Sequence, residues 1–405
     1  MRLEIAGIAA GGDGVARAEG MVVFVPRSAP GDVIRALVTP GSRFARATIE
    51  SIETPSPRRI EPPCPHYTMD RCGGCQLQHI EYGAQLDAKR SIIGDALRRI
   101  GKRAVDDPDV APSEMQWRYR RKLTLHLRWV GDRWVAGLHP YDDPAAVFEL
   151  TDCPITETAV MEIWAELRPA FVYLPRVPSL RVSVRLTAAG ATCVVAGGRS
   201  WPGQERFFRV APSLAELWWQ PERGRLRRVA THAGAAAGAS FIQVNAHVAE
   251  QLHAHVLARA RHHEPRTVVD AYAGMGATTM ELAADGRAVT AIELDADAVG
   301  RFASELMPPS RAIAGRVEEH LEASLPADVI LLNPPRSGVD ALVTEALQRV
   351  AAPPRAIIYV SCDPATLARD LARLPRYRVE ALRGYDMFPQ TAHVETVCEL
   401  VPDAA

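Results

Sequence analysis

The feature that most constrains the fold is an alternation of short apolar strands with helical segments between residue 240 and the C-terminus. Strand segments at 267–271, 289–293, 328–333 and 356–361 are separated by stretches with helical apolar spacing. Strands that alternate with helices pair in parallel, because each crossover helix returns the chain to the end of the sheet at which the previous strand began. We therefore predict a doubly wound α/β domain over residues 240–405, with its ligand crevice at the carboxyl ends of the strands.

A glycine-containing turn follows the first of these strands, in the run VVDAYAGMGATTM at 268–280. Gly274 and Gly276 let the backbone approach a ligand closely before a helix begins. The next strand ends at Glu293, where a carboxylate can accept hydrogen bonds from both hydroxyls of a ribose. The G-x-G-x-x-G pattern of dinucleotide folds is missing, so S-adenosylmethionine, which has no pyrophosphate, is the better expectation. A plain tight turn and a surface acid are the structural alternatives.

The other strand ends carry residues suited to catalysis. Asn333 begins a rigid NPPRSG loop that can hold a flat base, although Asn-Pro is also a common turn. Cys362 follows a strand, and the helix that begins after it favours a thiolate. Glu395 lies in the strand-like run HVETV, where a carboxylate costs free energy unless it is paired or functional. We predict Cys362 as a nucleophile and Glu395 as a general base; a core cysteine and a water-facing acid are the alternatives.

Seven cysteines occur in the chain, and three of them crowd together. Cys64, Cys72 and Cys75 lie in CPHYTMDRCGGC, and Cys153 follows in DCPI. Four thiolates suit either a zinc ion or an iron–sulfur cluster. Two C-x-x-C pairs would favour zinc, but this chain has one such pair, one cysteine near it and one distant cysteine. This pattern favours a [4Fe–4S] cluster, and a zinc site is the alternative.

The chain is predicted to have three domains. Residues 1–55 contain short β-branched strands between Gly and Pro turns, and five such strands fit a small oligonucleotide-binding (OB-like) β-barrel, or another small all-β domain. Residues 56–239 form an α+β central domain that bears the cysteines, mostly of strands, with helices at 82–100 and 156–167. Residues 240–405 form the α/β domain.

Charge and hydropathy limit the partners. The net charge of −1 provides no overall basic field for a nucleic acid. Local basic runs at 118–122, beside two aromatic residues, and at 223–228 could contact RNA or could be solvated strands and turns. No signal peptide and no long apolar run is evident, so we expect a cytoplasmic monomer without membrane contact.

The chain resembles, over nearly its full length, the bacterial 23S ribosomal RNA 5-methyluridine methyltransferases that carry a TRAM domain and an iron–sulfur cluster. VARAEG and MVVFVP resemble the TRAM barrel, and the cysteine run with Gln78-His79 resembles the cluster site. FIQVN at 241–245 resembles the opening of the catalytic domain. SCDPATLARD and DMFPQTAHVET are the most specific stretches.

The resemblance implies methylation of C5 of a uridine in RNA, most simply 23S rRNA, with tRNA as the alternative. Cys362 would add to C6 of uracil, and Glu395 would remove the C5 proton. The family's S-adenosylmethionine contacts are matched by Gln243, Tyr272, Glu293 and Asn333. Gly274, where the backbone can approach a ligand closely, is a fifth predicted cofactor-binding residue. The family's [4Fe–4S] ligands are matched by Cys64, Cys72, Cys75 and Cys153. The resemblance to a TRAM domain also implies that the protein binds RNA.

The chain departs from the family at several positions. Asn333 stands where Asp is usual, and Ala273 and Ala277 replace a Cys and an Asn or Glu. Two other functions therefore stay open: an amino-group methyltransferase, suggested by Asn-Pro-Pro, and an RNA-binding protein with a degenerate catalytic domain. Arg336 in place of an aromatic residue argues against the first. The retained Cys362 and Glu395 argue against the second.

Overall fold

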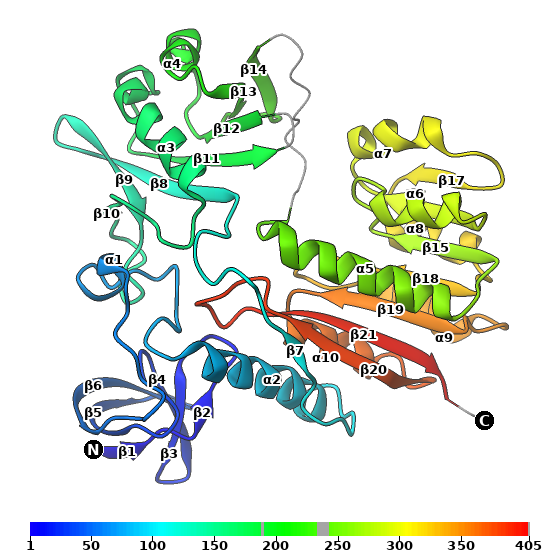
Figure 1. The fold of residues 1–405 in the computed structure, drawn as a ribbon, viewed down its shortest axis with the longest axis horizontal. Helices are drawn as coiled ribbons and strands as arrows, with labels where there is room; N and C mark the ends of the chain where they lie inside the picture. Colours follow the sequence, from blue (N-terminus) through cyan, green and yellow to red (C-terminus); the bar gives the residue numbers. More distant parts are fainter. Residues whose placement is uncertain (188–189, 233–242, 404–405) are drawn as a thin grey trace.

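The computed structural model describes residues 1–187, 190–232 and 243–403, which form three β-sheets (Figure 1). The N-terminal sheet has the order β1-β5-β6-β4-β3-β2 and buries a small apolar core that includes Leu3, Val23 and Ile34. It has six strands where the sequence predicted five, because its first two strands are too short to give a period-2 pattern. The strands are β1 (Arg2–Glu4), β2 (Gly7–Ile8), β3 (Gly14–Ala18), β4 (Met21–Val25), β5 (Val33–Pro40) and β6 (Ala45–Thr54).

The central sheet has the order β10-β9-β8-β11-β12-β13-β14, and helical segments pack on it around buried Trp164 and Phe207. Its pairs are antiparallel except β12 with β13, which are parallel. Its elements are β8 (Lys122–Val130), β9 (Arg133–Leu138), β10 (Phe148–Glu149), α3 (Thr158–Leu167), η1 (Arg168–Tyr173), β11 (Ser179–Thr187), β12 (Gly190–Ala196), α4 (Gln204–Val210), β13 (Leu214–Gln220) and β14 (Arg227–Thr231).

The C-terminal sheet has the order β17-β16-β15-β18-β19-β21-β20-β7. Strands β17 to β19 are parallel, as predicted, and β21 is antiparallel to both of its neighbours. The elements are α5 (Ala246–His262), β15 (Thr267–Ala271), α6 (Ala277–Ala284), β16 (Ala288–Glu293), α7 (Ala296–Phe302), η2 (Ala303–Glu305), β17 (Arg311–Ala314), α8 (Val317–His320), η3 (Glu322–Ser324), β18 (Val329–Leu332), α9 (Ala341–Arg349), β19 (Ala356–Ser361), α10 (Pro364–Ala372), β20 (Tyr377–Tyr385) and β21 (Glu395–Pro402).

Two elements from the predicted central segment pack on the C-terminal sheet. Helix α2 (Tyr82–Arg99) lies beside β20, and β7 (Val110–Ala111) pairs with β20 at the edge of the sheet (Figure 1). Ile93, Leu97 and Val110 share one apolar core with β15, β18 and β19. The sequence did not reveal this packing, because an amphipathic helix shows that it has a buried face but not which sheet covers it.

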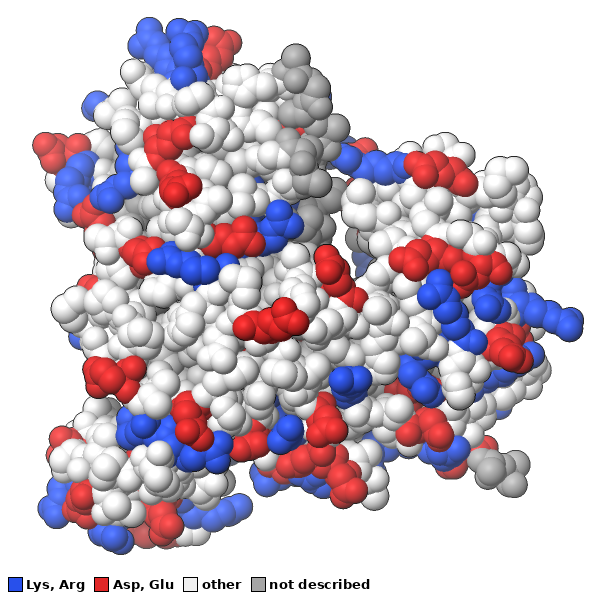
Figure 2. Space-filling view, in the orientation of Figure 1, with Lys and Arg blue, Asp and Glu red and all other residues white. Residues whose placement is uncertain are grey.

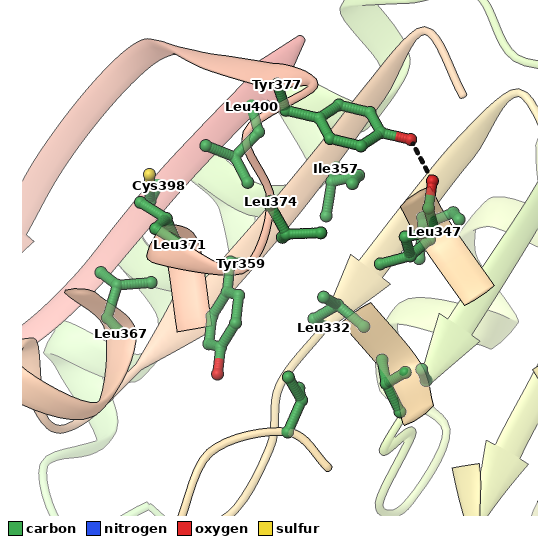
Figure 3. Packing of buried hydrophobic residues seen from close by; sticks show 14 of the residues in the cluster. Leu332, Leu347, Ile357, Tyr359, Leu367, Leu371, Leu374, Tyr377, Cys398 and Leu400 are labelled. Atoms are coloured by element: carbon green, nitrogen blue, oxygen red, sulfur yellow. Dashed lines mark hydrogen bonds between the residues drawn. The ribbon is translucent and has the colours of Figure 1, made fainter. Parts of the chain in front are cut away.

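The same apolar core extends beneath β19 and β21, where Tyr359 and Tyr377 are fully buried (Figure 3). The Tyr377 hydroxyl donates to the Leu347 carbonyl oxygen at 2.9 Å, and the Tyr359 hydroxyl donates to Asp370 Oδ2 at 2.8 Å. A buried hydroxyl that keeps a hydrogen-bond partner avoids the cost of an unsatisfied polar group. The two tyrosines therefore stabilise the core that packs against β19.

The predicted boundary at 239/240 and the residues Phe241 and Ile242 lie outside the described residues. In the part of the chain that the structure describes, no helix is long and apolar enough to span a membrane.

Candidate active site and cysteine pocket

Cys362 and Glu395 come together because β21 inserts beside β19. Ser361, the last residue of β19, is paired with Thr396. Pairing ends there, and a continuation of this register would oppose Cys362, directly after β19, to Glu395, the first residue of β21; the charge of Glu395 also acts on the Cys362 thiol. Directly opposed residues in an antiparallel pair carry their side chains on the same face, with Cβ atoms about 5 Å apart in regular pairing. The two predicted catalytic residues are therefore neighbours at the carboxyl edge of the sheet.

Glu395 is poised as a base by its burial. Its side chain is 5% exposed, and burial raises its pKa to about 7, while Arg336 pulls the pKa in the opposite direction. A carboxylate with a pKa near neutrality can both take up and release a proton at physiological pH, which is what a general base needs.

Cys362 is half-buried, and burial, followed by the charge of Glu395, raises the pKa of its thiol. This differs from the thiolate that the sequence predicted at a helix N-terminus. The main reason is burial, to which the charge of Glu395 adds; Asp363, the N-cap of α10, whose carboxylate accepts the Thr366 N–H at 2.9 Å, makes a smaller contribution in the same direction. Arg336 lowers the pKa of Cys362, so its guanidinium partly offsets burial and the charge of Glu395.

Tyr272, Gly274, Glu293 and Asn333 lie along the same edge. Tyr272 directly follows β15, and the register pairs Ala271 with both Ile292 and Leu332, so Glu293 and Asn333 flank it. The Glu293 carboxylate accepts the Gly274 N–H at 2.8 Å and the Asp295 N–H at 2.9 Å. These bonds hold the acid at the strand end with acceptor capacity left for two hydroxyl groups.

The turn after β15 leaves room for a ligand. Gly274 has φ +57°, and a Cβ placed there would meet no atom within 4 Å. Tyr272 also has positive φ, at 63°, which for a bulky residue marks a constrained position near a site. Buried Asp270, which the sequence did not single out, accepts the Thr279 hydroxyl at 2.6 Å and ties β15 to α6. Burial raises the pKa of Asp270 to about 6.

Gln243 lies two residues before Asn245, the N-cap of α5, and is half-buried. Asn245 accepts the Val248 N–H at 3.4 Å and donates to the Ser113 hydroxyl at 3.0 Å, so the start of α5 is fixed to the segment after β7. No described contact joins Gln243 to the other predicted cofactor residues.

The four predicted ligand cysteines line one pocket of about 200 Å³. Cys64 is the N-cap of α1 (Pro65–Thr68), Cys72 and Cys75 follow it, and Cys153 comes from the turn before α3. Burial raises the pKa of Cys72 to about 11, and it also raises the pKa of the other three thiols. In the described part of the chain, no three His, Cys, Asp or Glu side chains are arranged to hold a metal ion.

Two buried polar atoms beside this pocket have no described partner. They are Nη1 of Arg27 and Oε1 of Gln78. Arg27 comes from the segment after β4, donates to the Cys72 carbonyl oxygen at 2.6 Å and lies 3.3 Å from the Tyr67 ring centroid. Buried polar groups usually have partners, so these two atoms keep hydrogen-bonding capacity beside the pocket.

The predicted basic runs are largely committed to contacts within the protein. Arg118 forms a two-point ion pair with Asp152 at 2.7–2.8 Å, Arg121 lies 3.5 Å from Glu157, and Arg228 lies 3.4 Å from Glu216. The face of the molecule in Figure 2 mixes basic and acidic side chains and has no continuous basic area. These contacts involve Arg118, Arg121 and Arg228, and an RNA contact by either run stays a prediction.

A buried ion pair behind the site was missed at the sequence level. Lys89 of α2 pairs with Asp386, and both side chains are fully buried. The Tyr82 hydroxyl donates to Asp386 Oδ2 at 2.8 Å. A lysine on the apolar face of the predicted helix was the one available signal, but its partner lies 297 residues away.

Comparisons with known proteins agree with this geometry. The family model described as tRNA (Uracil-5-)-methyltransferase matches residues 311–401, which include Cys362 and Glu395. The chain is 31% identical to an uncharacterized RNA methyltransferase of Protochlamydia amoebophila, over 98% of this chain and 96% of the relative. It is also 31% identical to the 23S rRNA (uracil(1939)-C(5))-methyltransferase of Chromohalobacter salexigens, over 99% of this chain and 89% of the relative.

A solved structure shares the complete fold. The Pyrococcus abyssi tRNA (uracil-54, C5)-methyltransferase, in complex with S-adenosyl-L-homocysteine, superposes with a TM-score of 0.71 and 22% identity. The match covers 99% of both chains, and the C-terminal α/β fold is shared with this methyltransferase.

Proposed function

This chain belongs to the RNA (uracil-5-)-methyltransferase family, and we propose that it methylates C5 of a uridine through a covalent bond between Cys362 and C6 of the base. The observation that carries this mechanism is the register of β19 and β21, which sets Cys362 beside Glu395. A nucleophile and a base at one strand edge are what this reaction requires.

The reaction follows from the weakness of uracil C5 as a nucleophile. The Cys362 thiol loses its proton to water, helped by Arg336, and Sγ adds to C6, which makes C5 electron-rich. S-adenosylmethionine, when bound, supplies the electrophilic methyl group. Glu395 then takes the C5 proton, the C5–H electrons restore the C5–C6 double bond, and the Sγ–C6 bond breaks. The base must leave its stack to reach this edge.

We propose that Tyr272, Gly274, Glu293, Asn333 and Gln243 hold S-adenosylmethionine. The open space beside Gly274 and the fixed carboxylate of Glu293 fit a nucleoside with two free hydroxyls. Asn333 follows β18 with an exposed side chain and offers a neutral acceptor. Binding here would bring the methyl donor to the same sheet edge as Cys362.

The mechanism is tested by trapping. RNA that contains 5-fluorouridine has no C5 proton, so the reaction should stop with Cys362 bound to C6. We expect wild-type protein, incubated with labelled S-adenosylmethionine and this RNA, to give a labelled adduct that survives denaturing electrophoresis. Cys362→Ala should give none, while Cys398→Ala serves as the control, since Cys398 is buried in the core. An equal adduct with Cys362→Ala would exclude the mechanism.

We propose 23S rRNA as the substrate because of the full-length similarity to the Chromohalobacter enzyme, with tRNA as the second candidate because of the shared fold with the Pyrococcus enzyme. Labelled S-adenosylmethionine, unmodified 23S rRNA fragments and tRNA transcripts would distinguish them. Label in the 23S fragments alone is expected, and label in tRNA alone would overturn the choice.

We propose that Cys64, Cys72, Cys75 and Cys153 hold a [4Fe–4S] cluster. The shared 200 Å³ pocket and the unpartnered Nη1 of Arg27 support an anionic group there. Among the described residues no three of these side chains are arranged to hold a metal ion, so the proposal rests on the shared pocket and on four cysteines being the usual ligand set of such a cluster. Such a cluster would fasten this segment of the chain. Protein purified without oxygen should contain about four iron and four sulfide per chain; zinc in their place would overturn the assignment.

We also infer that the N-terminal sheet is a TRAM domain, an OB-like barrel that binds RNA. Its six short strands around a compact apolar core support this. Deletion of residues 1–55 should weaken RNA binding in a gel-shift assay without preventing binding of S-adenosylmethionine. The cytoplasmic location and the monomeric state stay predictions.

A further inference from the structure

The segment 386–394 joins β20 to β21 and ends at the base Glu395. Its backbone is bonded to the cysteine-bearing half of the chain. The Gln390 carbonyl oxygen accepts the N–H of Gln76 at 3.1 Å and of Leu77 at 3.0 Å, and Gln76 directly follows Cys75. The loop of the base and the loop of the cysteines are therefore in direct contact.

Gln390 is held from a second side. Gln85 of α2 donates from Nε2 to Gln390 Oε1 at 2.9 Å and accepts the Gln390 N–H at 3.0 Å. Gln390 is buried and has φ +70°, a left-handed conformation that a non-glycine residue seldom adopts. These reciprocal bonds fix the middle of the segment in a shape that it would otherwise rarely adopt.

Tyr119 links the cysteine pocket to the same segment. Its ring packs with Cys64 and Cys75 in one apolar cluster, and it is almost fully buried. Its hydroxyl donates to the Pro389 carbonyl oxygen at 3.0 Å. One side chain therefore contacts both the residues around the pocket and the segment that leads to Glu395.

The start of the segment is fixed by α2. Lys89 pairs with Asp386 and also donates to the Phe388 carbonyl oxygen at 3.1 Å. Together with the Tyr82 hydroxyl, these groups bury an ion pair whose remaining hydrogen bonds are satisfied within the protein. Segment 386–394 is thus held at its start, at Pro389 and at Gln390.

We propose that Tyr119 is a positioning residue for proton removal: through its bond to Pro389 it aligns Glu395 with C5, and it makes this alignment depend on the cysteine pocket. This inference rests on the proposed function. Glu395 lies only a few residues beyond Pro389, and an error of about 1 Å in the position of a catalytic group costs about 100-fold in rate. Cys362 directly follows β19 and lies outside segment 386–394, so we expect its position not to depend on Tyr119.

Tyr119→Phe tests the inference, because it keeps the ring in the cysteine pocket and removes only the bond to Pro389. We expect adduct formation with 5-fluorouridine RNA to stay within about twofold of wild type, whereas turnover on natural RNA falls about tenfold. Hydrogen exchange of the backbone amides at 386–395 should become faster. Iron content should not change.

Tyr377→Phe is the matched control, since it also removes a buried hydroxyl bonded to a backbone carbonyl, at 2.9 Å from Leu347, but away from this segment. It should not alter the ratio of turnover to adduct formation. Equal slowing of both steps in Tyr119→Phe, or unchanged exchange at 386–395, would overturn the inference. A wild-type protein that forms no adduct would instead overturn the proposed function.

Gln85→Glu provides a second variant if Tyr119→Phe does not fold. It keeps the acceptor for the Gln390 N–H and loses the Nε2 donor, which bonds Gln390 Oε1 and also the carbonyl oxygens of Leu77 and Ile80. The same selective loss of turnover with faster exchange at 386–395 supports the positioning role of the cysteine-bearing half. Full turnover with unchanged exchange would contradict it.

Discussion

At the scale of single residues, Glu395 combines the environment of a core residue with the role of a base. Burial raises its pKa to about 7, and only its ionised form can accept the C5 proton. We therefore expect the rate of methylated product release from the adduct to rise with pH through about 7 and then level off. Single-turnover measurements on natural RNA would follow this step. Glu395→Gln should accumulate adduct and show no such rise; a rise that persists in this variant would assign the pKa to another group.

A second prediction for a single residue concerns the affinity for S-adenosylmethionine and Asn333. An amide at this position offers an acceptor without charge, whereas S-adenosylmethionine carries a sulfonium and an ammonium group. Since hydrogen bonds to charged groups are about twice as strong as neutral ones, Asn333→Asp should lower the KM for S-adenosylmethionine about tenfold at constant RNA concentration. A tenfold change corresponds to about 1.4 kcal/mol. An unchanged KM would remove Asn333 from the cofactor site.

The sequence was sufficient for residues whose role depends on position along a strand. Cys362 was predicted directly after an apolar strand and Glu395 in the strand-like run HVETV, and the structure agrees on both positions, while their catalytic roles stay predictions. Lys89 and Asp386 could not be paired, because their 297-residue separation leaves no local pattern. The raised pKa of the Cys362 thiol was also out of reach, since it depends first on burial of the thiol in the folded chain and then on the charge of Glu395 across the sheet.

At the scale of elements, β21 decides the architecture of the site, because its insertion between β19 and β20 brings the base to the nucleophile. The alternation of strands and helices predicted the parallel part of the sheet correctly. It could not predict the antiparallel insertion or the addition of β7, because the strand order depends on contacts between distant segments.

Strand β21 is also joined to α5 by Glu399, which is almost fully buried and bonded to Arg259 and His263. Burial alone would raise the pKa of Glu399, but these hydrogen bonds outweigh it and the pKa is lowered. A lowered carboxylate pKa stabilises the folded state above the unfolded pKa, and this stabilisation disappears as the pH falls through the folded value.

Glu399→Gln should therefore reduce the free energy of unfolding at neutral pH by about 2 kcal/mol, and by progressively less toward acid pH. Urea denaturation at several pH values would measure both. Glu380→Gln on β20 is the control, because its ion pair with Arg378 is exposed and should contribute less than about 1 kcal/mol. A pH-independent difference for Glu399→Gln would contradict the assignment.

At the scale of the whole molecule, the catalytic sheet is not built from the C-terminal segment alone. Helix α2 and β7 cover it with Ile93, Leu97 and Val110, and the loop of the base is bonded to residues near Cys75. We expect a fragment of residues 240–405 to be insoluble, or to melt at a much lower temperature than the full chain, because it exposes this apolar surface. Supplying residues 82–111 in the same cell should restore soluble protein. A stable isolated fragment would show that the two halves fold independently.

The position of β21 at the end of the chain has a consequence for synthesis. The ribosome completes the nucleophile strand β19 before it makes β21, so a nascent chain that stops between them carries Cys362 without Glu395. Because domains fold in the order of their synthesis, α2 and β7 must wait for β20, which emerges more than two hundred residues later. If Glu395 is the base, as we propose, a chain that stops before β21 cannot release a captured RNA.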